Sequence, residues 1–315
     1  MSILLDAWRH TPTHRKVWAL AAPMILSNLS VPLVTLVDTA VIGHLPHTQQ
    51  LGAVVVGGSL YAMLVGVFGI LRMSATGFAA QAVGRGDGGA LRQVLLQSLV
   101  LAALIALLVG LLAIPLSGVA LHLVFFLITV QGTRLGDATV AANALLLNGL
   151  LVAAFALDGL AHAVEALCGH AIGARDRLAL RRALLVAGGW SLLGSLLFAL
   201  LFLLGGRLFI ELQSDIAEVR NAAYPYLPYL ALLPLIAVWS YLLDGLFIGA
   251  TRAREMRDAM LVSVALGLII GALLQDLGNH GLWLALLCFM LMRGLSLAIL
   301  GWRLQRQDAW LATSH

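Results

Sequence analysis

Charged side chains are scarce in this sequence. Asp, Glu, Lys and Arg make up 11% of the 315 residues, whereas hydrophobic residues make up 61%. An average soluble domain carries about 25% charged residues. Because so few polar side chains cannot cover a water-soluble globule, we expect much of the surface of this chain to lie in lipid.

Cysteines and enzyme motifs are also few. The only cysteines, Cys168 and Cys288, lie inside apolar runs, so no disulfide framework is expected. There is no His-Glu-x-x-His motif, no Gly-x-Ser-x-Gly elbow and no phosphate loop, because the run GRGDGG at 84–89 lacks the Lys-Ser/Thr pair. These absences argue against an enzyme, and we expect no cofactor and no bound metal.

Long apolar runs fill the rest of the chain. A helix of about 20 apolar residues crosses a hydrocarbon core of about 30 Å. Such runs predict an all-α polytopic membrane protein with about eight transmembrane helices, while the shorter stretch 119–133 predicts a stub that does not span. The predicted spans are 17–42, 52–83, 93–117, 139–172, 182–206, 223–250, 257–275 and 281–302.

The net charge of +4 does not indicate nucleic-acid binding, because the cations lie between the apolar runs. Fourteen of the 19 Lys and Arg residues fall in one set of connections and at the termini, against three in the opposite set. Cytoplasmic loops are enriched in Lys and Arg. The bias predicts that both termini are cytoplasmic, and only an even number of crossings keeps every basic loop on that side.

Residues 75–96 resemble residues 164–185 at an offset of 89. In each copy a helix end leads through a tight Gly- or Arg-containing turn to an Asp and the next helix. Parallel duplication of this kind is typical of transporters. Two unrelated hairpins that share their turn residues would also fit.

The apolar run at 139–172 contains Asp158, His162 and Glu165. Their i, i+4, i+7 spacing places them on one helix face. Ionisable side chains inside a membrane are costly and usually functional. The stripe predicts a site for a coupling cation, although a polar seam that joins helices would also explain it.

Asp38 lies near the outer end of the first span. Pro23 and Pro32 precede it in the same helix and are candidate kink sites, and Asn28 falls within about 80° of its face. We expect a proton or cation site at Asp38 and Asn28. The alternative is an acid that reaches the outer water.

Asp244 repeats the Leu-Asp-Gly sequence found at Asp158. Tyr241 is one turn before it, either as an aromatic wall for a cationic substrate or as an interfacial side chain. We expect Arg72 and Arg293, the two arginines in the interior of predicted spans, to be structural counter-ions to these acids.

Several separated stretches resemble the DinF branch of the multidrug and toxic compound extrusion (MATE) transporters. This resemblance implies twelve helices in two six-helix lobes and export of toxic compounds in exchange for protons or sodium. It also implies that Asp38 is the essential carboxylate of the first helix and that Asp244 supplies an acid to the second lobe. The stretches are LAAPMILSNLSVPLVTLVDTAVIGHL, RMSATGFAAQAVG, ALDGLAHAVEALCGHAIGARD and WSYLLDGLFIGATRAREMR.

The chain also departs from that pattern. Residues 1–124 resemble only the first three helices, and residues 125–315 resemble the end of the seventh helix through the twelfth, so helices four to six and the start of the seventh are missing. We therefore expect two unequal lobes, a truncated one at 1–124 and a fuller one at 125–315. The loss removes polar partners that Asp38 would have in the family.

The leading hypothesis is an efflux transporter in a bacterial inner membrane that exports cationic or amphipathic small molecules, with protons rather than sodium as the coupling ion. The alternative is a non-transporting remnant or scaffold left by the internal deletion.

Overall fold

The computed structural model describes residues 2–43, 72–104, 137–307 and 309–310. Over these ranges the chain is helical, without strands. A short helix, α1 (Ser2–Arg9), precedes the long α2 (Thr11–Gly43), and a hairpin of two helices follows at 72–85 and Gly88–Leu104. The remaining elements are α5 (Asp137–Gly173), α6 (Arg177–Glu211), α7 (Ala217–Ala223), η1 (Tyr224–Tyr226), α8 (Leu227–Gly249), α9 (Ala253–Leu273), η2 (Gln275–Leu277) and α10 (Asn279–Arg306).

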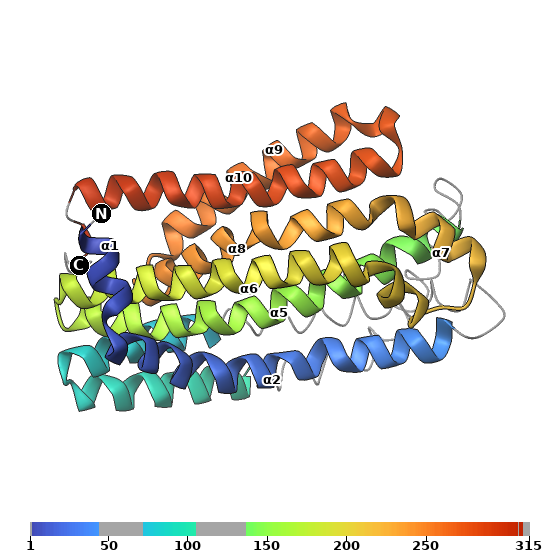
Figure 1. Cartoon of the computed structure of the whole chain (residues 1–315). Coiled ribbons are helices and arrows are strands. Elements are labelled where there is room, and N and C mark those ends of the chain that lie inside the picture. Colours follow the sequence, from blue (N-terminus) through green and yellow to red (C-terminus); the bar gives the residue numbers. More distant parts are fainter. Residues whose placement is uncertain (1, 44–71, 105–136, 308, 311–315) are drawn as a thin grey trace.

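The helices form a bundle in which α5, α6 and α8 occupy the centre (Figure 1). The helix α2 and the hairpin 72–104 lie on one side, and α9 and α10 lie on the other. Both termini lie at the same end of the bundle, together with the turns that follow residue 85, α5 and α8. The basic connections predicted to share one side of the membrane therefore do lie at one end.

Six helices in the described ranges are long and apolar enough to cross a membrane. They confirm six predicted spans, since α7, η1 and α8 together form the span predicted at 223–250. The hairpin 72–104 belongs to the other two, whose remaining parts lie outside the described residues, as does the predicted stub at 119–133. Pro23 and Pro32 both lie inside α2, which continues through them.

The internal repeat is visible in two turns with the same hydrogen bonds. Asp87 N–H donates to the carbonyl of Ala82 at 3.0 Å, and Asp176 N–H donates to that of Ala171 at 2.9 Å. Gly86 and Arg175 have φ of +71° and +56°, the left-handed conformation that ends a helix in a Schellman motif. Each Asp then accepts from backbone N–H groups of the next helix. The two turns therefore have the same conformation, which both the duplication and shared turn residues predict.

The two copies also meet each other. A Cβ on Gly84 would clash with the carbonyl oxygen of His170, and a Cβ on Gly173 would clash with that of Gln81. The two contacts are reciprocal under the offset of 89, so the helix at 72–85 crosses α5 about a local two-fold axis. Glycine permits this close backbone approach, as in membrane helix pairs generally.

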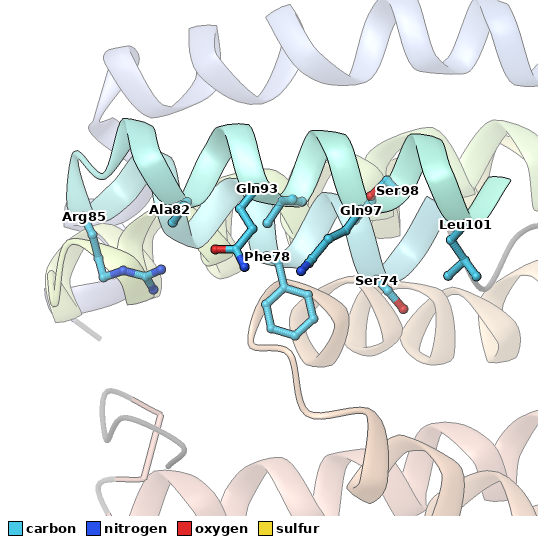
Figure 2. A pocket seen from close by; sticks show the side chains of 11 residues that line it. Ser74, Phe78, Ala82, Arg85, Gln93, Gln97, Ser98 and Leu101 are labelled. Carbon is cyan, nitrogen blue, oxygen red and sulfur yellow. The ribbon is translucent and has the colours of Figure 1, made fainter. Parts of the chain in front are cut away.

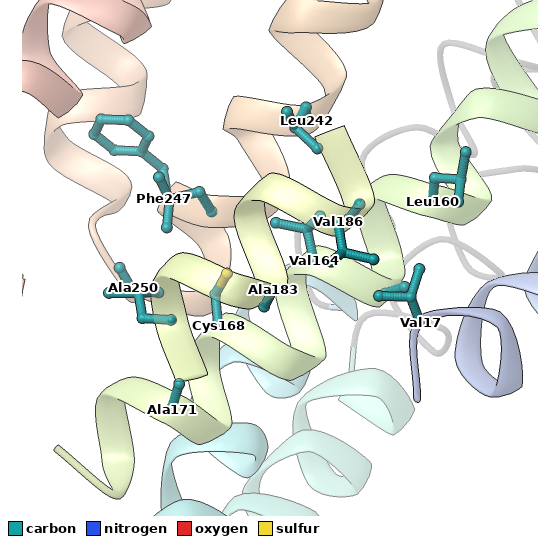
Figure 3. Close-up of a cluster of buried hydrophobic side chains, with 14 of the residues drawn as sticks. Val17, Leu160, Val164, Cys168, Ala171, Ala183, Val186, Leu242, Phe247 and Ala250 are labelled. Carbon is teal, nitrogen blue, oxygen red and sulfur yellow. The ribbon is translucent and has the colours of Figure 1, made fainter. Parts of the chain in front are cut away.

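Apolar packing concentrates around α5, α6 and α8. Figure 3 shows Leu242 of α8 over Val164 of α5 and Val186 of α6, with Cys168, Phe247 and Ala250 further along the same cluster. The first residues of α2, including Val17, close one side of it. A second cluster, with Leu145, Ile210, Leu230 and Trp283 at its centre, contains side chains from α5 to α8 and from α10. The bundle thus has its core in the C-terminal part of the chain.

Candidate functional site

The polar stripe of α5 forms a connected cluster. The His162 Nε2 atom lies 3.2 Å from a carboxylate oxygen of Asp158, and its Nδ1 atom lies 3.4 Å from one of Glu165. The His162 side chain is 9% exposed and that of Glu165 is 1% exposed, whereas that of Asp158 is 42% exposed. Within the described residues, the Glu165 carboxylate accepts no hydrogen bond. The stripe therefore runs from an open end at Asp158 to a buried acid.

Arg72 reaches this stripe from the helix at 72–85. One of its guanidinium nitrogens lies 3.3 Å from His162 Nδ1. A guanidinium can only donate, so in this arrangement Nδ1 is the acceptor and the proton of the neutral imidazole is on Nε2, where it can be donated to Asp158. Arg72 thus contacts the histidine between the acids, and this contact joins the helix at 72–85 to α5, the two helices in which the copies of the repeat begin.

A second constellation lies between α8 and α10. Arg293 forms an ion pair with Asp244, and the two side chains are 20% and 15% exposed. Tyr241 is half-buried one turn earlier on α8. Asp158 acts electrostatically on both Asp244 and Tyr241, and so does Arg293. The two constellations therefore form one electrostatic site.

The charges of this site do not cancel. Asp158, Glu165 and Asp244 supply three carboxylates, and Arg72 and Arg293 supply two guanidinium groups. With His162 neutral and the carboxylates ionised, the site carries one excess negative charge, and a protonated His162 removes it. An unbalanced charge is expensive at membrane depth. The arrangement can therefore take up one proton or one other monovalent cation.

The residues predicted around Asp38 are only partly described. The backbone of Asp38 belongs to α2, but its side chain lies outside the described part of the structure. Asn28 donates a long hydrogen bond of 3.5 Å to the carbonyl of Phe155 on α5. Pro32 is buried and Pro23 is exposed. In this structure Asn28 connects α2 to α5.

Two amide networks were missed at the sequence level. Asn148 on α5 donates to Thr39, the residue after Asp38, at 2.9 Å and to Gln213 at 3.0 Å, and all three are buried. Asn143 and Asn279 pair through both amides, and Trp283 also donates to Asn143. Amides inside apolar runs were the available signal, but Asn28 was the only one of them predicted to have a role.

The described side chains do not form a metal site. No group of three or more His, Cys, Asp or Glu residues within the described ranges is arranged so that it could hold a metal ion. His162 lies between Asp158 and Glu165, and it can form a hydrogen bond or an ion pair with these acids.

The sequence is similar to known proteins over almost its whole length. The sequence model of the MatE family matches residues 23–124 and 116–274. The chain is 32% identical to DNA damage-inducible protein F of Escherichia coli K12, over 96% of this chain and 95% of that protein. That alignment runs over 437 residues and this chain has 315, so part of the relative has no counterpart here.

The fold has a known counterpart as well. The crystal structure of the eukaryotic MATE transporter AtDTX14 superposes with a TM-score of 0.64 at 16% identity, covering 95% of this chain and 98% of that one. The polytopic all-α architecture predicted from the sequence is thereby confirmed. The family match and the identity to the bacterial relative show that this chain belongs to the MATE family, whose members are transporters and not enzymes.

Proposed function

We propose that this protein exports cationic or amphipathic toxic compounds from a bacterial cytoplasm in exchange for protons, and that the charge cluster around His162 is a coupling site. The single observation that carries the coupling proposal is the excess negative charge among Asp158, Glu165, Asp244, Arg72 and Arg293 around an imidazole. Histidine titrates in the range where a membrane proton gradient operates. An imidazole at the centre of the site favours a proton over sodium.

Protonation changes the hydrogen bonds that His162 can make. The neutral ring accepts from Arg72 at Nδ1, whereas the imidazolium has a proton there and can only donate, so it turns to Glu165. Arg72 then faces a second cation and its contact is lost. Since Arg72 is on the helix at 72–85 and His162 is on α5, proton uptake would loosen a contact between the two helices in which the copies of the repeat begin.

A contact of this kind can couple the binding of a proton to a change in the side of the membrane to which the site is open. Secondary transporters alternate by rocking one repeat against the other around a fixed site. In the proposed cycle the Arg72–His162 contact favours the arrangement seen here, in which the helix at 72–85 packs against α5, and the proton favours separation. A cationic substrate at Asp158, the most exposed acid of the stripe, would compete with the proton for the same excess charge.

The orientation proposed for the bundle follows the basic residues. The termini and the Arg-rich turns lie together at one end. By the positive-inside rule this end faces the cytoplasm, and α7 and η1 lie toward the opposite, outer surface. Asp158 lies four to seven residues before His162 and Glu165 along α5 and therefore nearer to the outer side, which suits release of substrate outward.

The test is transport in proteoliposomes with an imposed pH gradient and, separately, a sodium gradient, with ethidium as a fluorescent organic cation. We expect ethidium movement that depends on the pH gradient and that is lost in His162→Gln. His170→Gln is the matched control, because His170 lies on the same helix but is exposed. Equal transport by the two variants would reject His162 as a coupling group.

Asp38 remains a proposed second coupling group, and Asp38→Asn is expected to remove the dependence on the pH gradient as well. The alternative function, a non-transporting remnant, is favoured by the missing counterpart to part of the relative. Ethidium movement no faster than in empty liposomes, beside an active DNA damage-inducible protein F, would establish the remnant.

A further inference from the structure

A groove of about 430 Å³ lies between the helices at 72–85 and 88–104. Figure 2 shows Gln93 and Gln97 of the second helix beside Phe78 and Ser74 of the first, with Arg85 at the end where the chain turns. Gln93 and Gln97 are exposed, and their side chains make no hydrogen bond within the described residues. The groove therefore presents unpaired amides in a membrane-spanning part of the chain.

The internal repeat identifies what kind of element would cover this groove. Shifted by 89 residues, Ala82, Val94, Gln97 and Ser98 of the groove become Ala171, Ala183, Val186 and Ala187. All four of these are core residues. In the C-terminal copy this face is covered mainly by α8, through side chains such as Leu242 (Figure 3). The equivalent face of the N-terminal hairpin thus has the shape of a helix-binding surface.

The family comparison shows a similar asymmetry. The first match to the MatE model spans residues 23–124, whereas the second spans the longer stretch 116–274, which includes α8. Residues 52–71 and 105–117 belong to the same two predicted spans, 52–83 and 93–117, as the hairpin 72–104 does. Among the described helices, none occupies the position on the N-terminal hairpin that α8 has on α5 and α6.

Lipid alone is a poor occupant of this groove. Gln97 is four residues after the first residue of the span predicted at 93–117, which places it about 6 Å into a hydrocarbon core of about 30 Å. Acyl chains cannot hydrogen-bond to an amide, and amides at this depth typically pair across helices. The surrounding Leu96, Leu99 and Val100 are also exposed. The face therefore suits another transmembrane helix with its own amides.

We propose that the groove binds the same hairpin of a second copy of this chain, about a two-fold axis along the membrane normal. A glutamine side chain both donates and accepts, so Gln93 and Gln97 of two parallel copies can pair reciprocally. An isologous contact needs only such a self-complementary surface. The dimer places helices over the face that no described helix of the N-terminal half covers.

Disulfide cross-linking in membranes tests the contact directly. In a Cys168→Ala, Cys288→Ala background, Gln97→Cys is expected to form a disulfide-linked dimer of twice 33.4 kDa upon oxidation. Leu261→Cys is the matched control, since Leu261 is exposed on α9 at a similar distance from the basic end. Cross-linking that is no stronger at residue 97 than at residue 261 overturns the proposal.

The number of chains per lipid nanodisc gives a second measurement. We expect two copies for the wild type and a shift to one copy for Gln93→Leu, Gln97→Leu. One wild-type copy per disc, or one copy with a different protein in fixed ratio, overturns the dimer. If the double variant does not insert, the cross-linking still decides, because it needs no stable purified protein. Neither readout depends on transport, so the dimer and the exporter can fail separately.

Discussion

The centre of the C-terminal half is buried to a different degree from the described N-terminal helices. In the most apolar stretch of α5, 61% of the residues are buried, against 11% in that of α2, and the peripheral α9 of the C-terminal half is also 11% buried. Both buried apolar clusters are built mainly from the helices after residue 137, to which α2 adds only a few side chains. The N-terminal hairpin, by contrast, exposes a groove whose repeat equivalent is core.

This difference shows how the shorter half is held. Within the described residues it has no core of its own and relies on contacts with the fuller half. These contacts include the reciprocal glycine crossing, Asn28 and Thr39 against α5, and α1 against α6. We infer that stability resides in the C-terminal half and that changes in the N-terminal half act mainly on its attachment and on function.

The largest expected effect is on the ion pair of the C-terminal half. Arg293→Met leaves Asp244, whose side chain is 15% exposed, without its partner, and breaking a buried pair in this way costs up to about 3–5 kcal/mol. We expect this loss in the free energy of unfolding measured by denaturant titration in mixed micelles. Arg72→Met is the matched control in the other half, where the arginine is exposed and a stability loss well below that of Arg293→Met is expected.

A double variant separates charge from packing. Asp244→Leu combined with Arg293→Met removes both charges, so it should recover most of the stability that Arg293→Met loses. If Arg72→Met destabilises the protein as much as Arg293→Met does, the inference that stability resides in the C-terminal half is wrong.

The next largest effect is expected at the crossing between the halves. Gly173→Leu forces a side chain into the carbonyl of Gln81, and Gly84→Leu does the same at that of His170. Overpacking typically costs about 1–3 kcal/mol. Gly205→Leu is the control, because a Cβ at Gly205 meets nothing within 4 Å.

The measurement is again denaturant unfolding, combined with protease sensitivity of the turn at 86–87. We expect both crossing variants to expose this turn to cleavage before the C-terminal half unfolds. Loss of the whole fold in one step, with no early cleavage, would mean that the two halves are not separable as inferred.

Much of this fold could be predicted from the sequence because its signals are local. Runs such as 182–206 exceed the length of a membrane crossing, and α6 confirms that one. The turn at 173–176 repeats the one at 84–87 because both need a left-handed residue followed by a capping Asp. The spacing of Asp158, His162 and Glu165 placed them together because helix periodicity alone determines which residues share a face.

The remaining features depend on contacts between distant segments. That Arg72 contacts His162, and not an acid, follows from how the helix at 72–85 crosses α5, which no local pattern encodes. Asn143 and Asn279 are 136 residues apart and meet only after α5 and α10 pack. The groove was not predicted either, because an uncovered face has the same sequence pattern as a covered one.

The smallest expected effect is at the attachment of α1. Asp6 accepts a hydrogen bond of 2.9 Å from Arg182, but its side chain is 62% exposed. Exposed pairs of this kind contribute about 0.2–1 kcal/mol and are screened by salt. Trp8, which packs on Gly189 and lies 6.1 Å from the Trp190 ring, provides the larger part of the contact.

Asp6→Asn should therefore lower the unfolding temperature slightly in low salt and not in high salt. Asp258→Asn, which affects a pair between neighbouring residues of α9, is the control. A large loss in Asp6→Asn at all salt concentrations would mean that this ion pair, and not the packing of Trp8, attaches the N-terminus to the C-terminal half.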